Sequence, residues 1–421
     1  MNTSGQHPTP SAPTAPAAAP LRAATGFIPP LEGMRALAAF GVLATHVAFL
    51  TGTSTGSPIA RVWGRFDLWV AVFFALSGFL LWRRHALAAR DGGQRGHRRR
   101  PQRPVRGYYR SRVVRIMPAY LVVVLVALLA LPENVDIGIG EWVANLALVQ
   151  VLVPGSLVAG LTHAWSLSVE AAFYVVLPLL WLALSPLRGE RAKWRVPLIF
   201  ATAAVSLAWA YVPWEPLGLP AGINPHTLPA AFASWFAVGI LLAEFTAAPP
   251  RALLALYRAP WSKWVWWTAA ALIFLTTTST RLYAEGFVQA SPAEFAGRTG
   301  SGALIAWCLL SPIVLAGPEA RFRVLGSRPM LALGRWSYGV FLWHMVVLQL
   351  LFGVLGVPMF GGHMAIMWIA TAAVTVVVSA ASYAWIEEPA RRAAGQAPLR
   401  PAVPSSAPGS GSGSASESRR G

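Results

Sequence analysis

The sequence has almost no cysteine, since Cys308 is the one thiol among 421 residues. A single cysteine excludes an intrachain disulfide, and it excludes a zinc site built from a cluster of cysteines. Cys308 lies inside an apolar stretch, so it gives no information about the redox compartment.

Charged residues are also scarce, at 12% of the chain, and acidic residues are the rarer sign, with 16 Asp and Glu against 34 Lys and Arg. Hydrophobic residues make up 55% of the chain and the mean hydropathy is +0.52. A chain this apolar is not solvated as an ordinary globular domain. The composition therefore predicts an integral membrane protein, and many of the 19 Trp residues lie near the ends of apolar runs, where headgroups accommodate them.

The formal net charge of +18 raises the possibility of a nucleic-acid partner. The Arg residues, however, cluster in loops between apolar runs instead of forming one basic face. Membrane topology accounts for them more simply, and we predict no nucleic-acid partner. The chain also has no internal repeat of fixed period, which weakens the case for a transporter built from two related halves.

Both ends of the chain lack the apolar residues needed for a core. Residues 1–26 are rich in Pro, Ala and Thr and have no apolar stretch after a basic start, so they do not resemble a cleavable signal peptide. Residues 393–421 are rich in Pro, Ala, Ser and Gly. Such compositions predict disordered tails. We therefore expect one transmembrane domain at 27–392 between two disordered tails.

Apolar runs of roughly 17–25 residues are long enough to cross a bilayer as a helix. The sequence has ten such runs, which predict an all-α integral membrane protein with about ten transmembrane helices. The runs are 33–52, 66–82, 113–131, 165–184, 196–213, 228–246, 264–280, 300–317, 331–356 and 363–386.

The distribution of basic residues predicts the topology. Twelve Arg residues lie between 83 and 115, in the loop that joins the second and third runs, so this loop is expected in the cytoplasm. With ten spans the later basic loops lie on the same side, and both termini are cytoplasmic. A further run, 141–158, is interrupted by Pro154 and Gly155. Counting it as a span would move every later basic loop outside, so we expect it to be re-entrant or to lie along the outer surface.

Two ionisable residues lie inside the first predicted span. Arg35 and His46 are eleven residues apart, about three helical turns, so they share a face and are separated by roughly 16 Å along the axis. A lone histidine on an apolar helix is often a packing residue. Ionisable groups inside the bilayer are costly, however, and usually have a function. His46 is therefore a candidate general base, because a neutral imidazole accepts a proton near physiological pH.

A polar stripe runs along the predicted helix at 165–184. His163, Ser166 and Tyr174 lie at offsets of minus seven, minus four and plus four from Glu170. Such a stripe is expected to face a cavity instead of lipid. Glu170 then either orients His46 or contacts a substrate, and the alternative is a structural hydrogen bond to a neighbouring helix.

Further polar residues occur at helical spacing elsewhere. Arg112 and Arg115 are three residues apart, where guanidinium groups bind phosphates well, although anchoring at the membrane surface is the simpler alternative. Ser337 and His344, with Tyr338 beside them, form a polar face that either lines the same cavity or bonds to a neighbouring helix.

Two other types of site are not favoured. Ser77 and Gly78 are not flanked by the Gly-x-Ser-x-Gly pattern of a nucleophile, so we expect close helix packing there. His46, His163 and His344 are the candidates for a metal site, but they lack ligand spacing in the sequence, and we expect no metal.

Six segments carry these residues in a characteristic order: LEGMRALAAFGVLATH, DLWVAVFFALSGFLL, RSRVVRIMPAY, THAWSLSVEAAFYVVLPLL, LGRWSYGVFLWH and WIEEPARR. In this order they resemble the motifs of the membrane acyltransferase 3 family, from about Phe27 to Arg392. Glu32, Ala36 and Thr45 depart mildly from the family's first motif. The sequence resembles the stand-alone members, which lack a fused extracytoplasmic hydrolase-like domain.

The resemblance implies an acyl-CoA dependent O-acyltransferase of a bacterial plasma membrane, with acetyl-CoA or another short acyl-CoA as donor. The acceptor would be a hydroxyl of a carbohydrate, glycolipid or glycosylated metabolite. The resemblance implies that His46 is essential and that Arg112 and Arg115 bind acyl-CoA, and Arg35 at its motif position either binds the donor as well or polarises the thioester. From the polar faces we also predict a catalytic role for Glu170. Acceptor contacts are predicted for Ser166, Tyr174, Tyr338 and His344. A multi-pass transporter of a polar or glycosylated solute is the alternative, because polar stripes also line translocation pathways.

Overall fold

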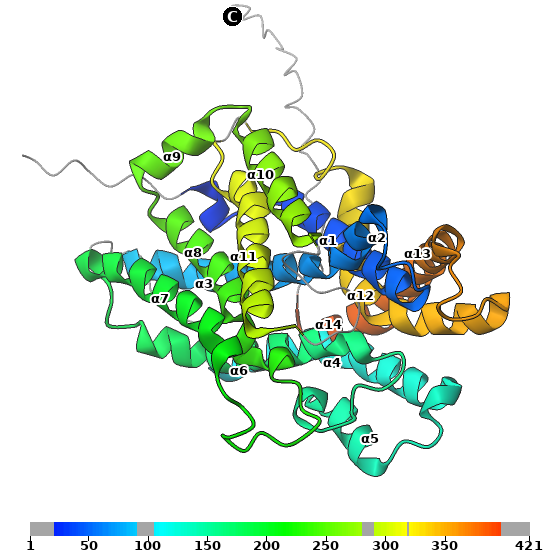
Figure 1. Cartoon of the computed structure of the whole chain (residues 1–421). Coiled ribbons are helices and arrows are strands. Elements are labelled where there is room, and N and C mark those ends of the chain that lie inside the picture. Colours follow the sequence, from blue (N-terminus) through cyan, green and yellow to red (C-terminus); the bar gives the residue numbers. More distant parts are fainter. Residues whose placement is uncertain (1–20, 91–104, 280–289, 318–319, 397–421) are drawn as a thin grey trace, which may run out of the picture.

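The computed structural model describes residues 21–90, 105–279, 290–317 and 320–396 (Figure 1). Residues 1–20 and 397–421 of the predicted tails, and part of the basic loop between 83 and 115, lie outside this range. The described chain contains helices and no strand, as predicted.

Each of the ten predicted spans corresponds to a helix. These helices are α1 (Pro29–Leu50), α3 (Trp69–Arg90), α4 (Val105–Ala130), α6 (Trp165–Ala183), α7 (Arg195–Leu207), α8 (Ala233–Ala247), α10 (Ser262–Thr277), α11 (Pro292–Val314), α12 (Arg328–Leu355) and α13 (Met364–Ser382). Short helices α2 (Pro58–Gly64), α5 (Ile139–Leu146), α9 (Arg251–Arg258) and α14 (Glu388–Ala393) connect or extend them.

Eight helical stretches of the described chain are long and apolar enough to cross a membrane. The two predicted spans that do not meet this standard are α10 and α11. Helix α10 has 16 residues. Helix α11 has 23 residues but starts with a polar turn, in which Ser291 and Glu294 form a capping box. Helix α10 packs on α11, and α11 packs on α3 and α8, so both belong to the same bundle.

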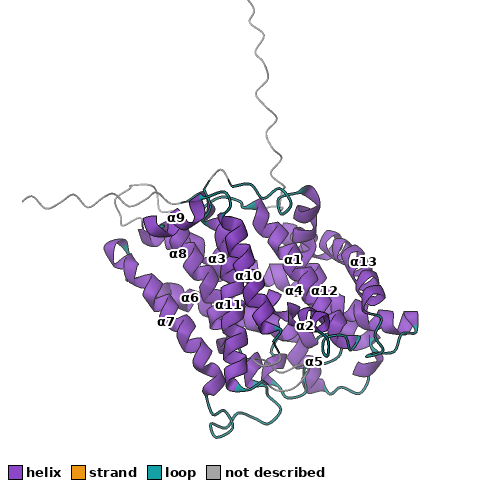
Figure 2. Cartoon of the chain, turned by 45° about the horizontal axis from the view of Figure 1, so that its top comes forward, coloured by secondary structure: helices purple, strands orange, loops and turns teal. Residues whose placement is uncertain are grey.

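The run 141–158 is not a spanning helix. It forms the short helix α5 and a following 3₁₀ turn at the lower edge of the bundle (Figure 2). The Asn145 side chain donates hydrogen bonds to the Glu141 and Ser156 carbonyls, both at 2.9 Å. Asn134 likewise donates to Ala159 at 3.1 Å. These amides satisfy backbone groups that a continuous helix would have satisfied internally.

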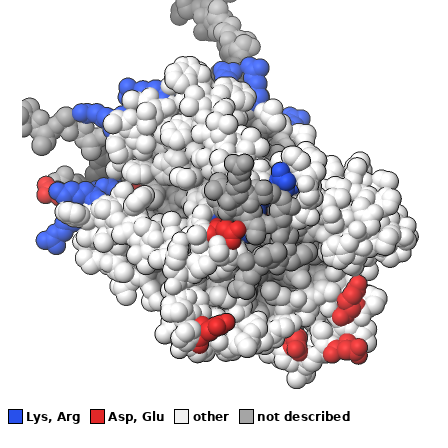
Figure 3. All heavy atoms as spheres, in the orientation of Figure 1, with Lys and Arg blue, Asp and Glu red and all other residues white. Residues whose placement is uncertain are grey.

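Most long helices run between two layers of loops (Figure 2). One layer contains α9, and the opposite layer contains α5. Lys and Arg gather at the edge near α9 and at the start of α7, whereas Asp and Glu gather over α5 (Figure 3). We call these the basic end and the acidic end. The positive-inside rule assigns the basic end to the cytoplasm.

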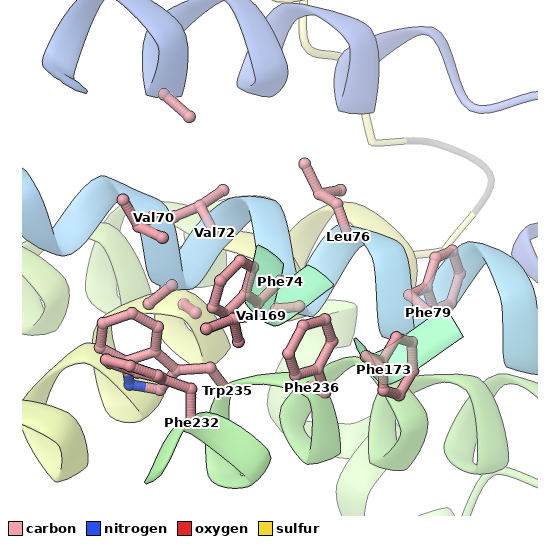
Figure 4. Packing of buried hydrophobic residues seen from close by; sticks show 14 of the residues in the cluster. Val70, Val72, Phe74, Leu76, Phe79, Val169, Phe173, Phe232, Trp235 and Phe236 are labelled. Atoms are coloured by element: carbon pink, nitrogen blue, oxygen red, sulfur yellow. The ribbon is translucent and has the colours of Figure 1, made fainter. Parts of the chain in front are cut away.

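An aromatic part of the hydrophobic core joins α3, α6 and α8 (Figure 4). Phe236 of α8 stacks on Phe74 of α3 and on Phe173 of α6, with ring centroids 4.4 and 4.0 Å apart. Rings in this geometry add attraction to the area that they bury. The cluster holds α6 firmly against α3. It thereby also fixes the position of the polar stripe, which α6 carries.

Helices α3 and α8 approach so closely that only glycine fits between them. A Cβ atom on Gly239 would lie 1.8 Å from the Ala75 carbonyl oxygen, and one on Gly78 would lie 2.3 Å from the Phe236 carbonyl oxygen. The prediction of close packing at Gly78 is therefore confirmed.

A proline in α6 leaves a backbone carbonyl without its helical donor, and a neighbouring helix supplies the hydrogen bond instead. Pro178 has no N–H to donate to the carbonyl of Tyr174, four residues earlier. The Tyr108 hydroxyl of α4 donates to that carbonyl at 3.1 Å. Tyr109 donates to the next carbonyl, that of Val175, at 2.9 Å. Two adjacent tyrosines thus fix α4 on α6.

A buried charge network joins α3, α7 and α8. Glu244 accepts hydrogen bonds from the Arg195 Nε and the Trp82 Nε1, both at 2.7 Å, and from Arg90 at 3.2 Å. Arg195 and Glu244 are completely inaccessible to solvent. Pairing is required because an isolated buried charge is very costly.

The folded part of the chain begins earlier than the sequence predicted. Residues 21–26, which we assigned to the N-terminal tail, are described and include a 3₁₀ turn at Arg22–Ala24. The backbone N–H of Leu21 donates to the Thr246 carbonyl at 2.9 Å. Arg83 donates to the Gly26 carbonyl at 2.7 Å. These hydrogen bonds give this short segment an ordered position that its own composition does not provide.

Candidate active site

A cavity of about 60 Å³, which we call the central pocket, lies among α1, α3, α4, α6 and α12. Its polar lining consists of Arg35, Ser77, Arg115, Ser166, Glu170, Tyr174, Ser337 and Tyr338. Its apolar lining consists of Val70, Phe73, Phe74, Ile116, Leu167 and Phe341. Six of the nine site residues predicted from the sequence therefore line one cavity.

Glu170 is the hydrogen-bonding centre of the pocket. The Ser77 and Tyr174 hydroxyls both donate to its Oε1 atom, and the two hydroxyl oxygens are 3.4 Å apart. Among the described residues no hydrogen bond joins Glu170 to His46. The structure therefore does not support the hypothesis that Glu170 orients His46. Glu170 instead lies in the pocket wall, where it can contact a substrate.

Ser77 was not recognised as a site residue in the sequence. The expectation that it serves helix packing is wrong, because its hydroxyl lines the pocket and bonds to Glu170. Its neighbour Gly78 provides the close packing. The two residues lie on different faces of α3, and a local pattern that suggested one role for both concealed this difference.

Arg35 reaches the pocket from the first turns of α1. Its Nη1 atom lies 3.2 Å from the Oε1 of Glu32, one helical turn earlier. The pair is partly exposed, so its contribution to stability is modest. The contact uses one edge of the guanidinium and leaves other N–H donors of Arg35 for a ligand.

Arg112 and Arg115 occupy different environments. Arg115 is exposed and lines the pocket. Arg112 lies over the ring of Tyr174, with its guanidinium carbon 5.8 Å from the ring centroid. The structure therefore separates the predicted pair into one arginine that faces the pocket and one that packs against its wall.

The remaining hydroxyls at the pocket already have partners. Ser166 donates to the His163 carbonyl at 3.1 Å, and Tyr338 donates to the Ile116 carbonyl at 2.8 Å. Ser337 donates to the Gly334 carbonyl at 2.8 Å. A hydroxyl that donates still has lone pairs that accept, so these side chains can receive a hydrogen bond from a substrate.

Three histidines meet beside the pocket, at the far end of α1 from Arg35. The ring centroids of His46 and His344 are 5.0 Å apart, those of His163 and His344 are 4.7 Å apart, and those of His46 and His163 are 6.1 Å apart. His163 and His344 are buried, whereas His46 is partly accessible. We call these residues the histidine cluster. In the part of the chain that the structure describes, no group of His, Cys, Asp or Glu side chains has the arrangement of a metal site.

Phe341 connects the histidine cluster to the central pocket. It lines the pocket, and its ring centroid is 5.0 Å from that of His163 and 6.2 Å from that of His344. Phe73, also in the pocket wall, packs on Phe341 at 6.2 Å. Phe341 is therefore a wall that the central pocket and the histidine cluster share.

His163 was part of the predicted stripe but was not among the predicted site residues. It lies in a 3₁₀ turn that ends where α6 begins, and it is 2% exposed. The offset of minus seven from Glu170 was the available signal, but only the fold brings this turn against α1 and α12.

Comparison with known proteins identifies the class of this membrane protein. The model of an acyltransferase domain matches residues 28–384. The chain is also similar to acyltransferase MdmB of Streptomyces mycarofaciens, with 28% identity over 349 residues, covering 76% of this chain and 79% of that protein. No solved structure matches the chain. The protein is thus a membrane acyltransferase, and it belongs to the acyltransferase 3 family.

Proposed function

We propose that the protein transfers an acyl group from acyl-CoA to a hydroxyl of a carbohydrate, glycolipid or glycosylated metabolite. The site would lie in a bacterial plasma membrane, with the basic end in the cytoplasm. Acyl-CoA enters from that end and its phosphates bind Arg35 and Arg115, with Arg112 adding positive charge nearby. His46 is the general base.

The proposed reaction needs no further co-substrate, because His46 only borrows a proton and returns it. The acceptor hydroxyl gives its proton to the His46 imidazole as its oxygen attacks the thioester carbonyl. The tetrahedral intermediate collapses with cleavage of the C–S bond, and the CoA thiolate takes the proton back from His46. The products are an ester and free CoA.

The observation that carries the proposal is the position of the central pocket. Its wall includes Arg35 and Arg115, which suit the anionic donor, and Phe341, which contacts the histidine cluster. Arginine binds phosphate bidentately, whereas a partly accessible imidazole suits proton transfer. The small, aromatic pocket favours acetyl or another short acyl group, as in O-acetylation.

Several side chains suit the acceptor. Glu170, Ser166, Tyr174 and Tyr338 offer oxygen atoms in the pocket. A buried donor or acceptor without a partner costs about 1–3 kcal/mol. An acceptor hydroxyl in the pocket would avoid that cost by bonding to these oxygen atoms, so we place the acceptor there.

The test is thioester turnover by purified protein in lipid. Acetyl-, succinyl- and longer acyl-CoAs are supplied with and without crude cell-envelope glycans, and free CoA is measured. We expect glycan-dependent release that falls by about a hundredfold or more in His46→Ala, as for loss of a general base. His226→Ala is the matched control, because His226 lies outside both the pocket lining and the histidine cluster.

Two results would contradict the proposal. One is full transferase activity of a folded His46→Ala protein, which would remove the assigned base. The other is no turnover with any donor together with accumulation of a labelled glycosylated solute in proteoliposomes, which would indicate the transporter.

A further inference from the structure

His46 makes two contacts through the same ring nitrogen. Its Nδ1 atom is 2.8 Å from the Val42 carbonyl oxygen, one turn earlier on α1, and 3.2 Å from Nε2 of His344 on α12. The second contact crosses from one helix to another, between residues almost 300 positions apart in the chain. His344 is the one side chain that is hydrogen-bonded to the His46 ring in the described structure.

The Val42 carbonyl determines where the proton of His46 lies. A carbonyl oxygen only accepts, so Nδ1 of His46 must carry the hydrogen. The Nε2 of His344, which faces the same N–H, must then be an acceptor with no hydrogen of its own.

The backbone around His344 requires the same arrangement. Its Nδ1 lies 2.7 Å from the Phe341 carbonyl oxygen and 3.1 Å from that of Val340. Nδ1 of His344 therefore carries the hydrogen, and Nε2 of a neutral ring has the lone pair. Two carbonyls on separate helices thus lead independently to one assignment for both rings, without choosing a tautomer in advance.

We propose that His344 is a positioning residue that holds His46 with Nε2 as its basic atom. The single His46 Nδ1–H is shared between the Val42 carbonyl and His344 Nε2, and His344 Nδ1–H donates to the Phe341 carbonyl. This arrangement leaves the lone pair of His46 Nε2 free for the substrate hydroxyl. This inference rests on the proposed function, since it assigns the atom that acts in that reaction.

The His46–His344 hydrogen bond also stabilises His46 when it takes up the hydroxyl proton. When Nε2 of His46 takes the hydroxyl proton, the ring becomes an imidazolium and its Nδ1–H becomes a stronger donor. The lone pair of His344 Nε2 then stabilises the new positive charge on His46. His344 itself is completely buried, so no water competes for that lone pair. No proton has to move from His46 to His344, and the proton on Nε2 returns to the leaving thiolate.

This role predicts which substitutions of His344 are tolerated. In His344→Leu the acceptor is lost while side-chain volume is nearly kept, and we expect kcat to fall about tenfold or more, as for loss of a hydrogen bond to a charged group. The KM for acetyl-CoA should stay within about twofold, since the contact strengthens only in the transition state. His344→Gln places a carbonyl oxygen near the position of Nε2 and should restore most of kcat.

A second measurement needs no acceptor. Bromoacetyl-CoA, a reactive analogue of the donor, alkylates an unprotonated imidazole nitrogen with loss of bromide. We expect wild-type His46 to be labelled at Nε2, which acid hydrolysis followed by amino-acid analysis distinguishes from labelling at Nδ1. In His344→Leu the labelling should stay at Nε2, because the Val42 carbonyl still accepts from Nδ1–H, but it should be slower.

The outcomes separate this inference from the proposed function. Labelling at Nδ1, or His344→Leu with the kcat of the wild type beside an inactive His46→Ala, would overturn the role of His344 and leave the transferase intact. If Leu and Gln variants are equally impaired, His344 serves packing alone and the inference is also wrong. Full activity of His46→Ala would reject both. Monodisperse elution and an unchanged melting temperature establish that the variants are folded.

Discussion

At the scale of single residues, Arg112 and Arg115 show how one helix divides two similar side chains between different tasks. The two residues are three positions apart on α4, yet Arg115 is exposed at the pocket and Arg112 packs over Tyr174. A guanidinium that stacks on a ring contributes through packing as well as charge. We therefore expect the two substitutions to have different effects.

Arg115→Ala should raise the KM for acetyl-CoA about tenfold or more, because a charge-assisted hydrogen bond to phosphate contributes about 1.5–3 kcal/mol. The melting temperature should hardly change, since Arg115 is exposed. Steady-state kinetics in nanodiscs measure the first effect, and a thermal shift measures the second. Arg110→Ala, an exposed arginine of the same helix that does not line the pocket, is the matched control. An unchanged KM in Arg115→Ala would remove it from the donor site.

Much of the site could be predicted from residue type and spacing. Glu170, Ser166 and Tyr174 line the pocket because residues four apart share a helix face. The histidine cluster could not be predicted in this way. His46, His163 and His344 are far apart in the chain, and their proximity depends on how α1, α12 and the turn before α6 pack in three dimensions.

At the scale of elements, α4 and α6 depend on each other through a defect in α6. Pro178 leaves the Tyr174 carbonyl without its helical donor, and the Tyr108 hydroxyl replaces that donor. Tyr174 in turn bonds to Glu170, so this repair supports the wall of the central pocket. A proline that would weaken an isolated helix therefore creates a specific contact between two helices.

This dependence predicts a non-additive pair of substitutions. Tyr108→Phe leaves a buried carbonyl unsatisfied and should lower the free energy of unfolding by about 1–3 kcal/mol. In the Pro178→Ala background the backbone N–H of residue 178 can bond to that carbonyl, so Tyr108→Phe should cost clearly less. Unfolding of the four proteins in mixed micelles measures the coupling. Equal costs in both backgrounds would show that the hydroxyl does not serve the carbonyl.

The elements themselves were largely predictable. All ten apolar runs are helices, because apolar length and the need to satisfy backbone groups in lipid leave few alternatives. The charge pattern correctly excluded 141–158 from the spanning helices. The ordered residues 21–26 were missed, since their position depends on Thr246 and Arg83, which are remote in the sequence.

At the scale of the whole molecule, charge is divided between the two ends of the bundle. Basic residues lie at the end with α9 and acidic residues lie over α5 (Figure 3). This division places the exposed residues of α9 in the cytoplasm and those of the segment around α5 outside. The proposed entry of acyl-CoA at Arg35 and Arg115 depends on this orientation.

The orientation can be measured with single cysteines, because Cys308 is the one native thiol. In a Cys308→Ala background, Asp136→Cys should react with a membrane-impermeant maleimide in intact right-side-out vesicles. Ala255→Cys, on an exposed face of α9, should react only after detergent is added. The cysteine-free parent is the control. The opposite pattern would reverse the topology and place the arginines of the pocket outside.

The buried pair of Arg195 and Glu244 has a consequence for biogenesis. The stretch Gly189–Tyr211, which includes α7, has the lowest mean hydropathy of the eight candidate spans, and it begins with a completely buried cation. A charge in a membrane helix costs about 2.5–3.5 kcal/mol on insertion scales, a cost that a carboxylate partner reduces. That partner emerges from the ribosome later, near the end of α8. We therefore expect stable integration of α7 to depend on α8, with the two segments entering the bilayer as a helical hairpin.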